Sequence, residues 1–189
     1  MVEIAPEIAI ETERLILREW REEDRQPFAA MNADPEVMRY FQSTLTKSES
    51  DALVDRIALH FRTHGFGLFA LERKSDGAFL GFTGFSSCPE NTPVQGETEI
   101  GWRLAQKYWR RGYAHEAASA CADWFWQNTN RARLVSYTSA ANQPSRNLMG
   151  KLGFIHSPER DFDHPAIASD HPLRRQVVYV LNRRDAANG

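Results

Sequence analysis

The most informative segment of the sequence is Tyr108-Trp109-Arg110-Arg111-Gly112-Tyr113-Ala114. Small and apolar residues then recur at offsets 0, 3, 4, 7, 10 and 11 from Ala114, which is the spacing of an amphipathic helix. The first turn of a helix offers unpaired backbone N–H groups and a positive dipole end, which favour an anion. Gly112 lets the backbone approach a phosphate, and Arg110 and Arg111 add charged donors. A plain glycine turn with two solvated arginines has the same spacing, so spacing leaves both interpretations open.

The residue patterns on either side of this segment predict a mixed α/β order of elements. Three strands, 66–72, 79–86 and 97–104, precede it without a long helix between them, and Ser75-Asp76-Gly77 predicts a turn that makes the first two antiparallel. The segment between Ile155 and Arg175 fits no element. The remaining predicted elements are a strand at 14–18, helices at 22–32, 35–40 and 47–65, a strand at 134–138, a helix at 144–152 and a strand at 176–182.

Composition indicates one globular domain over residues 1–189, with 42% apolar and 25% charged residues. A net charge of -2 disfavours a nonspecific nucleic-acid binder, and no uncharged run exceeds 13 residues, too short to span a membrane. Met1 to Ile10 lacks the basic start of a signal peptide. Cys88 and Cys121 are too few for a disulfide framework. These features predict a cytoplasmic protein without a membrane or nucleic-acid partner.

Further motifs stand in a fixed order around the first stretch. Taken together, they resemble the GNAT superfamily of acetyl-CoA-dependent N-acetyltransferases, and within it the RimJ/RimL-like branch, over about residues 11 to 182. The motifs are Thr12-Glu13-Arg14-Leu15-Ile16-Leu17-Arg18, Ala33-Asp34-Pro35-Glu36-Val37-Met38, Glu99-Ile100-Gly101-Trp102, Asn142-Gln143-Pro144-Ser145-Arg146-Asn147 and Lys151-Leu152-Gly153-Phe154.

The resemblance implies a mostly antiparallel, twisted sheet with flanking helices, in which the central strands 97–104 and 134–138 splay apart. Acetyl-CoA would be the co-substrate, with its pantetheine arm in the splay, and no metal would be needed. The family's loop begins with Gln or Arg, whereas this chain has Trp109, a change that keeps the N–H groups. By similarity, the cofactor-binding residues are Trp102, Arg103, Leu104, Arg110, Arg111, Gly112, Tyr113, Ala114, Asn142 and Arg146.

Two residues are the catalytic candidates. Because a primary amine is mostly protonated at neutral pH, a base helps its attack on the thioester, and Glu99 beside the splay is our choice, with Glu97 as the fallback. An exposed strand glutamate is the alternative role for Glu99. Many relatives carry a tyrosine acid where this chain has Met149, so Ser145 or a water takes that role.

The acceptor and two other classes of function stay open. The acceptor amine is either a protein N-terminus or a small molecule, and a homodimer is left open. A non-catalytic acyl-CoA-binding protein is the alternative from another class. The elements Asp161-Phe162-Asp163-His164-Pro165 and Asp170-His171-Pro172 could form a metal site, a solvated loop or an acceptor-site loop, although no helical pair sets a metal geometry. A metal-dependent hydrolase built on these elements is the third class, and it would need stoichiometric metal in the purified protein.

Overall fold

The computed structural model describes residues 9–183, which form one sheet of nine strands with helices on its faces. The prediction for Met1 to Ile10 therefore lies almost entirely outside the described residues. The strands are β1 (Ile10–Glu11), β2 (Leu15–Arg18), β3 (Leu68–Arg73), β4 (Phe79–Ser87), β5 (Thr98–Leu104), β6 (Arg133–Ser139), β7 (Ile155–His156), β8 (Phe162–Asp163) and β9 (Arg175–Asn182). The helices are α1 (Arg25–Ala33), α2 (Pro35–Met38), α3 (Lys47–His64), α4 (Tyr113–Asn128) and α5 (Gln143–Lys151).

The sheet is mostly antiparallel, and its strand order is β1-β2-β3-β4-β5-β6-β9-β7, with β8 also on β9. Strand β5 pairs with β4 over seven residues, from Ser87 with Thr98 to Gly81 with Leu104. Its parallel pairing with β6 is the single register pair Glu99 with Val135. The predicted fold class and the predicted splay of these two strands are therefore confirmed.

Two helices begin at the capping residues that the local sequence predicts. Thr46 and Glu49 form a reciprocal capping box at the start of α3, and the Asp34 side chain accepts from the Glu36 N–H to start α2. The single helix predicted over 22–32 is instead a 3₁₀ turn at Glu22–Asp24 followed by α1. No helix within residues 9–183 has the length and apolar character needed to cross a bilayer.

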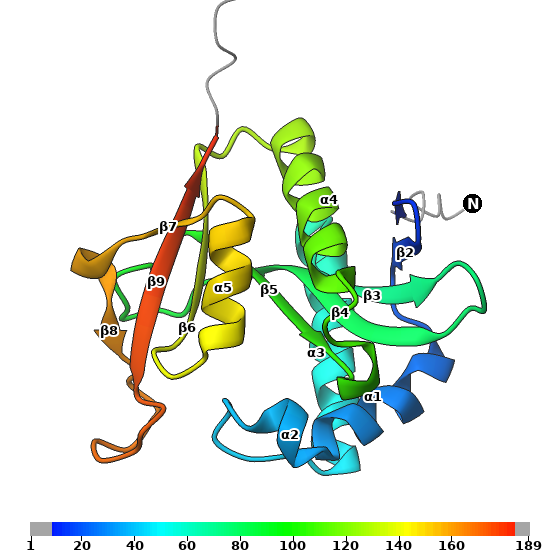
Figure 1. Cartoon of the computed structure of the whole chain (residues 1–189), viewed down its shortest axis with the longest axis horizontal. Coiled ribbons are helices and arrows are strands. Elements are labelled where there is room, and N and C mark those ends of the chain that lie inside the picture. The colour runs from blue at the N-terminus through cyan, green and yellow to red at the C-terminus, as the bar shows by residue number, and fades with distance from the viewer. Residues whose placement is uncertain (1–8, 184–189) are drawn as a thin grey trace, which may run out of the picture.

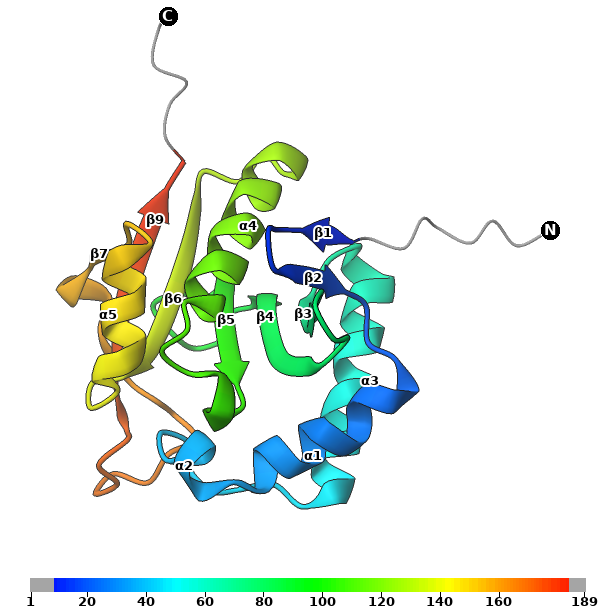
Figure 2. The ribbon, with the colours of Figure 1, turned by 45° about the vertical axis from the view of Figure 1, so that its right-hand side comes forward.

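Helices lie on both sides of the sheet (Figure 1). Helix α4 packs on β4 and β5 from one side, while α3 lies on the other side, and α1 and α2 lie below the end of β5 in both ribbon views (Figure 2). Trp20, Trp124 and Trp126 pack against the core, as expected of core aromatics. The main core includes Leu15, Leu17, Phe69, Phe85, Ile100, Phe125 and Leu134, none of which is exposed.

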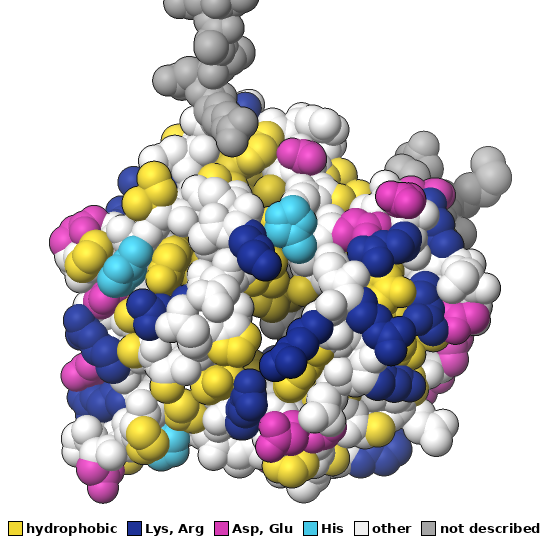
Figure 3. Space-filling model, viewed as in Figure 1, with side chains coloured by type: hydrophobic (Ala, Val, Ile, Leu, Met, Phe, Trp, Pro, Cys, Tyr) yellow, Lys and Arg dark blue, Asp and Glu magenta, His cyan; other side chains and the backbone are white. Residues whose placement is uncertain are grey.

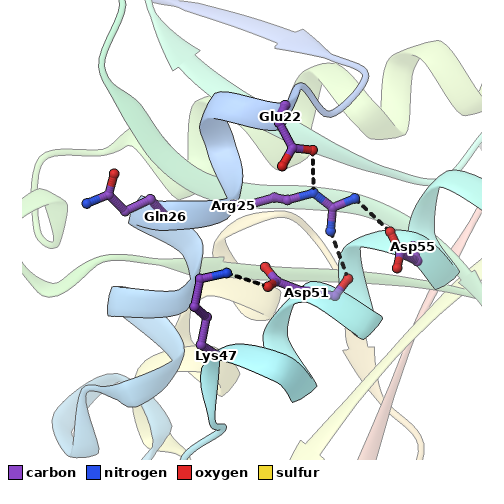
Figure 4. A pocket seen from close by; sticks show the side chains of 6 residues that line it. All are labelled: Glu22, Arg25, Gln26, Lys47, Asp51 and Asp55. Carbon is purple, nitrogen blue, oxygen red and sulfur yellow. Dashed lines mark hydrogen bonds and ion pairs between the residues drawn. The ribbon is translucent and has the colours of Figure 1, made fainter.

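An ion-pair network joins α1 to α3 (Figure 4). Arg25 donates to Glu22 at 2.7 Å, to Asp55 at 2.6 Å and to the backbone carbonyl of Asp51 at 3.1 Å. Lys47 donates to the Asp51 carboxylate at 2.6 Å. These contacts join the two helices, while Asp51 Oδ1 is buried without a hydrogen-bond partner among the described residues.

The segment between Ile155 and Arg175, which fitted no predicted element, contains β7, a 3₁₀ turn and β8. Both short strands pair with β9, at Ile155 with Val180 and at Phe162 with Gln176. Strands of two residues are too short to show alternation in the sequence, and a partner strand elsewhere in the chain decides whether they form. The same holds for β1, which pairs with β2 and was not predicted.

Candidate active site

A cleft opens where β5 and β6 separate beyond the Glu99–Val135 pair. Its volume is about 1130 Å³, which is large enough for an extended ligand. It is lined from one side by β5 and the start of α4, and from the other by β6 and α5. Figure 3 shows the hollow between these parts of the molecule, with Lys and Arg side chains at its rim; the lining includes Arg39, Arg103, Arg110 and Lys151.

The loop before α4 presents its backbone to this cleft. Arg110 and Gly112 have φ angles of 59° and 82°, in the left-handed region, where glycine is the least strained residue. Arg111, between them, does not have a positive φ, so the backbone alternates in conformation, which turns successive N–H groups toward one side. Helix α4 starts directly after this loop, at Tyr113. Trp109, which replaces the family's Gln or Arg, donates from Nε1 to the Leu104 carbonyl at 2.7 Å. The tryptophan therefore anchors the loop to the end of β5.

The start of α4 is held by the β1–β2 turn. Glu116 accepts from the Thr12 hydroxyl at 2.6 Å, from the Arg14 N–H at 2.9 Å and from the Arg14 Nε at 2.7 Å. Arg14 also donates to the carbonyl of Arg111 at 3.0 Å. A helix N-terminus fixed from two sides can offer its N–H groups to an anion without rearranging.

Glu99 lies at the inner end of the cleft, at the point where the strands part. Burial raises the pKa of Glu99 to about 7, and hydrogen bonding from Ser86 and Tyr137 acts in the opposite direction. The Ser86 hydroxyl lies 3.3 Å from Glu99 Oε2. A carboxyl group that titrates near neutral pH can both take and release a proton there.

Ser86 and Tyr137 are site residues that sequence reasoning missed. Tyr137 lies on β6 and lines the cleft, and burial followed by the nearby Glu99 charge raises its pKa above the ordinary value, so its hydroxyl stays protonated. Period two along β6 places Tyr137 on the same face as Val135, which pairs with Glu99. That register was the signal that could have identified Tyr137, once β5 and β6 were taken as parallel neighbours.

Glu97, the fallback base, is engaged elsewhere. Its carboxylate lies 2.9 Å from Arg133 and 3.2 Å from Arg160, and it is not among the cleft-lining residues. Both arginines contact Oε1 of this carboxylate, away from the cleft. The geometry therefore favours Glu99 over Glu97 as the base.

Asn142 and Ser145 line the cleft at the start of α5. Asn142 Oδ1 accepts from the Ser145 N–H at 3.2 Å, and Asn142 Nδ2 donates to the Thr138 hydroxyl at 2.9 Å. The asparagine thus caps α5 and ties it to β6. Met149, at the position of the family's tyrosine acid, is 1% exposed and belongs to the core.

Most of the predicted site residues meet in this one cleft, and two do not line it. Arg111 is exposed, and Arg146 contacts the Tyr179 hydroxyl and the Ala140 carbonyl instead. Their predicted roles toward acetyl-CoA stay predictions. The residues that line the cleft are Glu99, Trp102, Arg103, Leu104, Arg110, Gly112, Tyr113, Ala114, Asn142 and Ser145.

The His/Asp segment also reaches the cleft, through His164 and Ile167. His164 Nδ1 and His171 Nδ1 accept from the N–H groups of Ala166 and Leu173. Within residues 9–183, no three His, Cys, Asp or Glu side chains gather as metal ligands would. Of the three roles left open for this segment, an acceptor-site loop agrees best with where it lies.

Comparison with known proteins gives the same family that the motifs indicate. Residues 14–155 match the family model for an acetyltransferase (GNAT) domain. The uncharacterized N-acetyltransferase p20 of Bacillus licheniformis is 28% identical over 148 residues, which cover 76% of this chain and 80% of p20. A solved acetyltransferase from Agrobacterium tumefaciens str. C58 is 25% identical, with a TM-score of 0.76 over 93% of this chain and 95% of that one. RimL, a ribosomal L7/L12 alpha-N-protein acetyltransferase solved with coenzyme A, shares the fold, with a TM-score of 0.75 at 14% identity over 93% of this chain and 98% of RimL.

Proposed function

The chain belongs to the GNAT acetyltransferase family, and from that premise we propose that it transfers the acetyl group of acetyl-CoA to a primary amine by direct attack in a ternary complex. The observation that carries the proposal is the convergence of two features on one cleft. The N-terminus of α4, which suits an anion, forms part of the cleft wall. Glu99, a carboxyl group with a pKa of about 7, lies at the inner end of the cleft.

The residues present fit acetyl-CoA. The edge of β5 from Gly101 to Leu104 faces the splay, where an extended pantetheine arm can bond to backbone groups as an added strand would. The N–H groups after Arg110 and the N-terminus of α4 suit the pyrophosphate. A Cβ at position 112 would lie 3.3 Å from Arg14 Nη2 and would be strained at this φ angle, so glycine suits the position.

Glu99 then accepts the proton that the attacking amine loses. An alkylamine has a pKa of about 10, so its neutral form is scarce at neutral pH, and a base that titrates near 7 is the strongest that remains deprotonated there. Tyr137 and Ser86 orient the carboxylate. Acetyl-CoA supplies the thioester carbonyl, and its thiol, with a pKa of about 8.5, leaves with little acid assistance. The absence of a tyrosine at Met149 is therefore compatible with turnover.

The two cysteines favour direct attack over an acyl-enzyme. Burial raises the pKa of Cys88 to about 12, with nearby Glu99 and Glu97 adding to the rise. Burial also raises the pKa of Cys121, which is not exposed at all. Thiols in this state are poor nucleophiles, since the thiolate is the attacking form.

The test is a thiol-release assay with acetyl-CoA against two panels of acceptors, peptides with varied N-termini and small primary amines. Acetylated product identified by mass, formed together with free CoA, is the expected result. Thiol release no faster than hydrolysis with every amine, together with tight acetyl-CoA binding, would instead establish a non-catalytic acyl-CoA-binding protein. The cytoplasm is the compartment we propose, on the charge and cysteine usage of the sequence.

A further inference from the structure

Arg103 is a half-buried cation of the cleft that has no carboxylate partner among the described residues. Its Nη1 donates to Asn32 Oδ1 at 2.7 Å, while its Nε is buried and has no hydrogen-bond partner within residues 9–183. Burial lowers the pKa of Arg103 to about 10, with no charged group offsetting it, and the guanidinium remains charged at neutral pH. Glu36 is another acidic residue of the cleft lining, but its carboxylate pairs with Arg39 at 3.5 Å and not with Arg103.

Aromatic rings cover the guanidinium but leave donors free. The Arg103 guanidinium carbon lies 4.0 Å from the ring centroid of Phe41 and 5.4 Å from that of Phe82. Phe41 is 43% exposed, which is unusual for a large apolar side chain. Cation–π contacts stabilise a buried cation but use its faces, whereas a carboxylate or phosphate binds the N–H groups at its edge.

The direction of Arg103 is set by helices outside the sheet. Asn32, on α1, is not exposed, and its Nδ2 donates to the Ser50 hydroxyl of α3 at 2.9 Å. This bond orients the amide so that Oδ1 faces Arg103. A buried amide held at both ends is a rigid support, so the guanidinium is positioned before any ligand arrives.

Arg103 and Glu99 lie on the same face of β5, four residues apart, so about 13 Å separates their Cα atoms. The Arg103 side chain meets α1 and the segment after α2, whereas the proposed pyrophosphate cradle lies at the start of α4. An amine that reacts beside Glu99 would therefore extend its far end toward Arg103.

We propose that Arg103 is a specificity-determining residue that binds an anionic group of the acceptor, a carboxylate remote from the reacting amine. This inference rests on the proposed acetyl transfer and narrows its acceptors to acidic ones. In an extended peptide, each residue spans about 3.3 Å. Four residues of extended chain span about 13 Å, so a glutamate about four residues from the reacting N-terminus covers the distance.

The experiment compares matched acceptors that differ in one charge. One set is a peptide series with Glu, Gln or Lys at each of positions 2 to 5 after a constant N-terminal alanine. The other set pairs 5-aminopentanoate and longer ω-amino acids with their amides. The measurement is the ratio of kcat/KM for the acidic and neutral members, in wild type, Arg103→Gln, Arg103→Lys and Arg103→Glu. Thermal unfolding of each variant shows that it is folded.

In wild type we expect the acidic member of at least one pair to be favoured about 10- to 100-fold, the effect of one or two charge-assisted hydrogen bonds. The ratio falls to about one in Arg103→Gln, stays partial in Arg103→Lys, and shifts toward the Lys peptide in Arg103→Glu. In wild type, the kcat/KM ratio of acidic to neutral acceptors should also fall as the salt concentration rises. This measurement does not depend on whether any variant folds.

Two results would overturn the inference while leaving acetyl transfer intact. One is equal turnover of acidic and neutral members by the wild type, and the other is a preference that survives in Arg103→Gln. A lower acetyl-CoA affinity in Arg103→Gln with an unchanged acceptor ratio would assign Arg103 to the cofactor instead. Absence of turnover with every acceptor would overturn the proposed function, and this inference with it.

Discussion

Two strands of the sheet, β2 and β5, each carry charged side chains that are wholly or partly buried. Their pKa values are shifted in opposite senses, toward the charged form for Arg18 on β2 and toward the neutral forms on β5. On β2, Arg18 is 3% exposed and donates to Asp24 at 2.7 and 3.0 Å and to Glu72 at 2.6 Å. Burial acts to lower the pKa of Arg18, but these hydrogen bonds raise it above its ordinary value. On β5, burial shifts the pKa values of both Glu99 and Arg103 toward their neutral forms.

The difference separates charges that serve the fold from charges available to a ligand. A buried ion needs a partner, because the loss of hydration costs several kcal/mol. The β2 cluster supplies its own partners. Glu99 and Arg103 on β5 have neutral hydrogen-bond partners but no oppositely charged one among the described residues, so a substrate that brings a proton or an opposite charge can interact with them.

The largest effect that would test this contrast is on turnover. Glu99→Gln keeps the shape of the side chain and removes the basic group, so kcat at neutral pH should fall about 10²- to 10⁴-fold while acetyl-CoA binding is retained. The defect should shrink as pH rises toward the pKa of the amine. Glu97→Gln is the matched control, since Arg133 and Arg160 hold that carboxylate, and it should change kcat little. A wild-type-to-Glu99→Gln ratio that is constant from pH 6 to 10 would reject the base.

The next effect is on stability and compares the two arginines. Arg18→Met leaves Asp24 buried without its cation and should lower the free energy of unfolding by about 3–5 kcal/mol. Arg103→Met removes a buried charge that has no ion-pair partner, a gain that offsets the lost bond to Asn32, and should stay within about 1 kcal/mol of wild type. Urea unfolding measures both. Equal losses in the two variants would show that the arginines play the same structural role.

Two glycines with similar φ angles, one in the cleft and one outside it, extend the comparison to the backbone. Gly112 and Gly96 have φ angles of 82° and 81°, and Gly112 alone lines the cleft. Gly112→Glu should weaken acetyl-CoA binding about 10- to 1000-fold, since a charged side chain enters the cradle and disturbs one or two charge-assisted bonds. Gly96→Glu carries a comparable strain in φ, and its Cβ would meet nothing within 4 Å, whereas a Cβ at position 112 would lie 3.3 Å from Arg14 Nη2. Calorimetry that finds the same affinity in both variants would refute the cradle.

The smallest effect is the pH dependence of stability contributed by Glu99. Its pKa is about 7 in the folded protein and 4.5 as a free side chain, so the folded state holds the proton more tightly. The resulting stability is complete below pH 4.5 and is lost as pH rises through 7. Glu99→Gln has no such loss and should be more stable than wild type by up to about 3 kcal/mol at pH 8, a gap that closes at pH 4. Denaturant unfolding at both pH values measures it, and a gap of the same size at both would contradict a raised pKa.

Elements set by neighbouring residues could be predicted closely. The capping box of Thr46 and Glu49 begins α3 because both partners lie within one helical turn. The stripe from Ala114 to Phe125 predicts α4, and the motifs around Glu99 and Gly112 indicate the family that the comparison then showed. Such signals are local, and a chain carries them before it folds.

The site could be predicted only in part, because its electrostatics depend on contacts between distant residues. Tyr137 meets Glu99 through the pairing of two strands separated by a helix, and Asn32 meets Arg103 across 71 residues of sequence. The role of Arg18 also comes from Glu72, 54 residues away. Alternation along one strand indicates which face a side chain takes, but not which charges lie opposite it.

The residue pattern was therefore sufficient for the order of the longer helices and strands and for the family motifs, since each depends on spacing within a short segment. It also nominated Glu99, whose role stays a prediction. The tertiary structure decided which charges were left without partners. The same residue types, arginine and glutamate, form a closed cluster on β2 and an open pair on β5. Desolvation and hydrogen bonding set their pKa values, and both depend on what packs against them after the chain has folded.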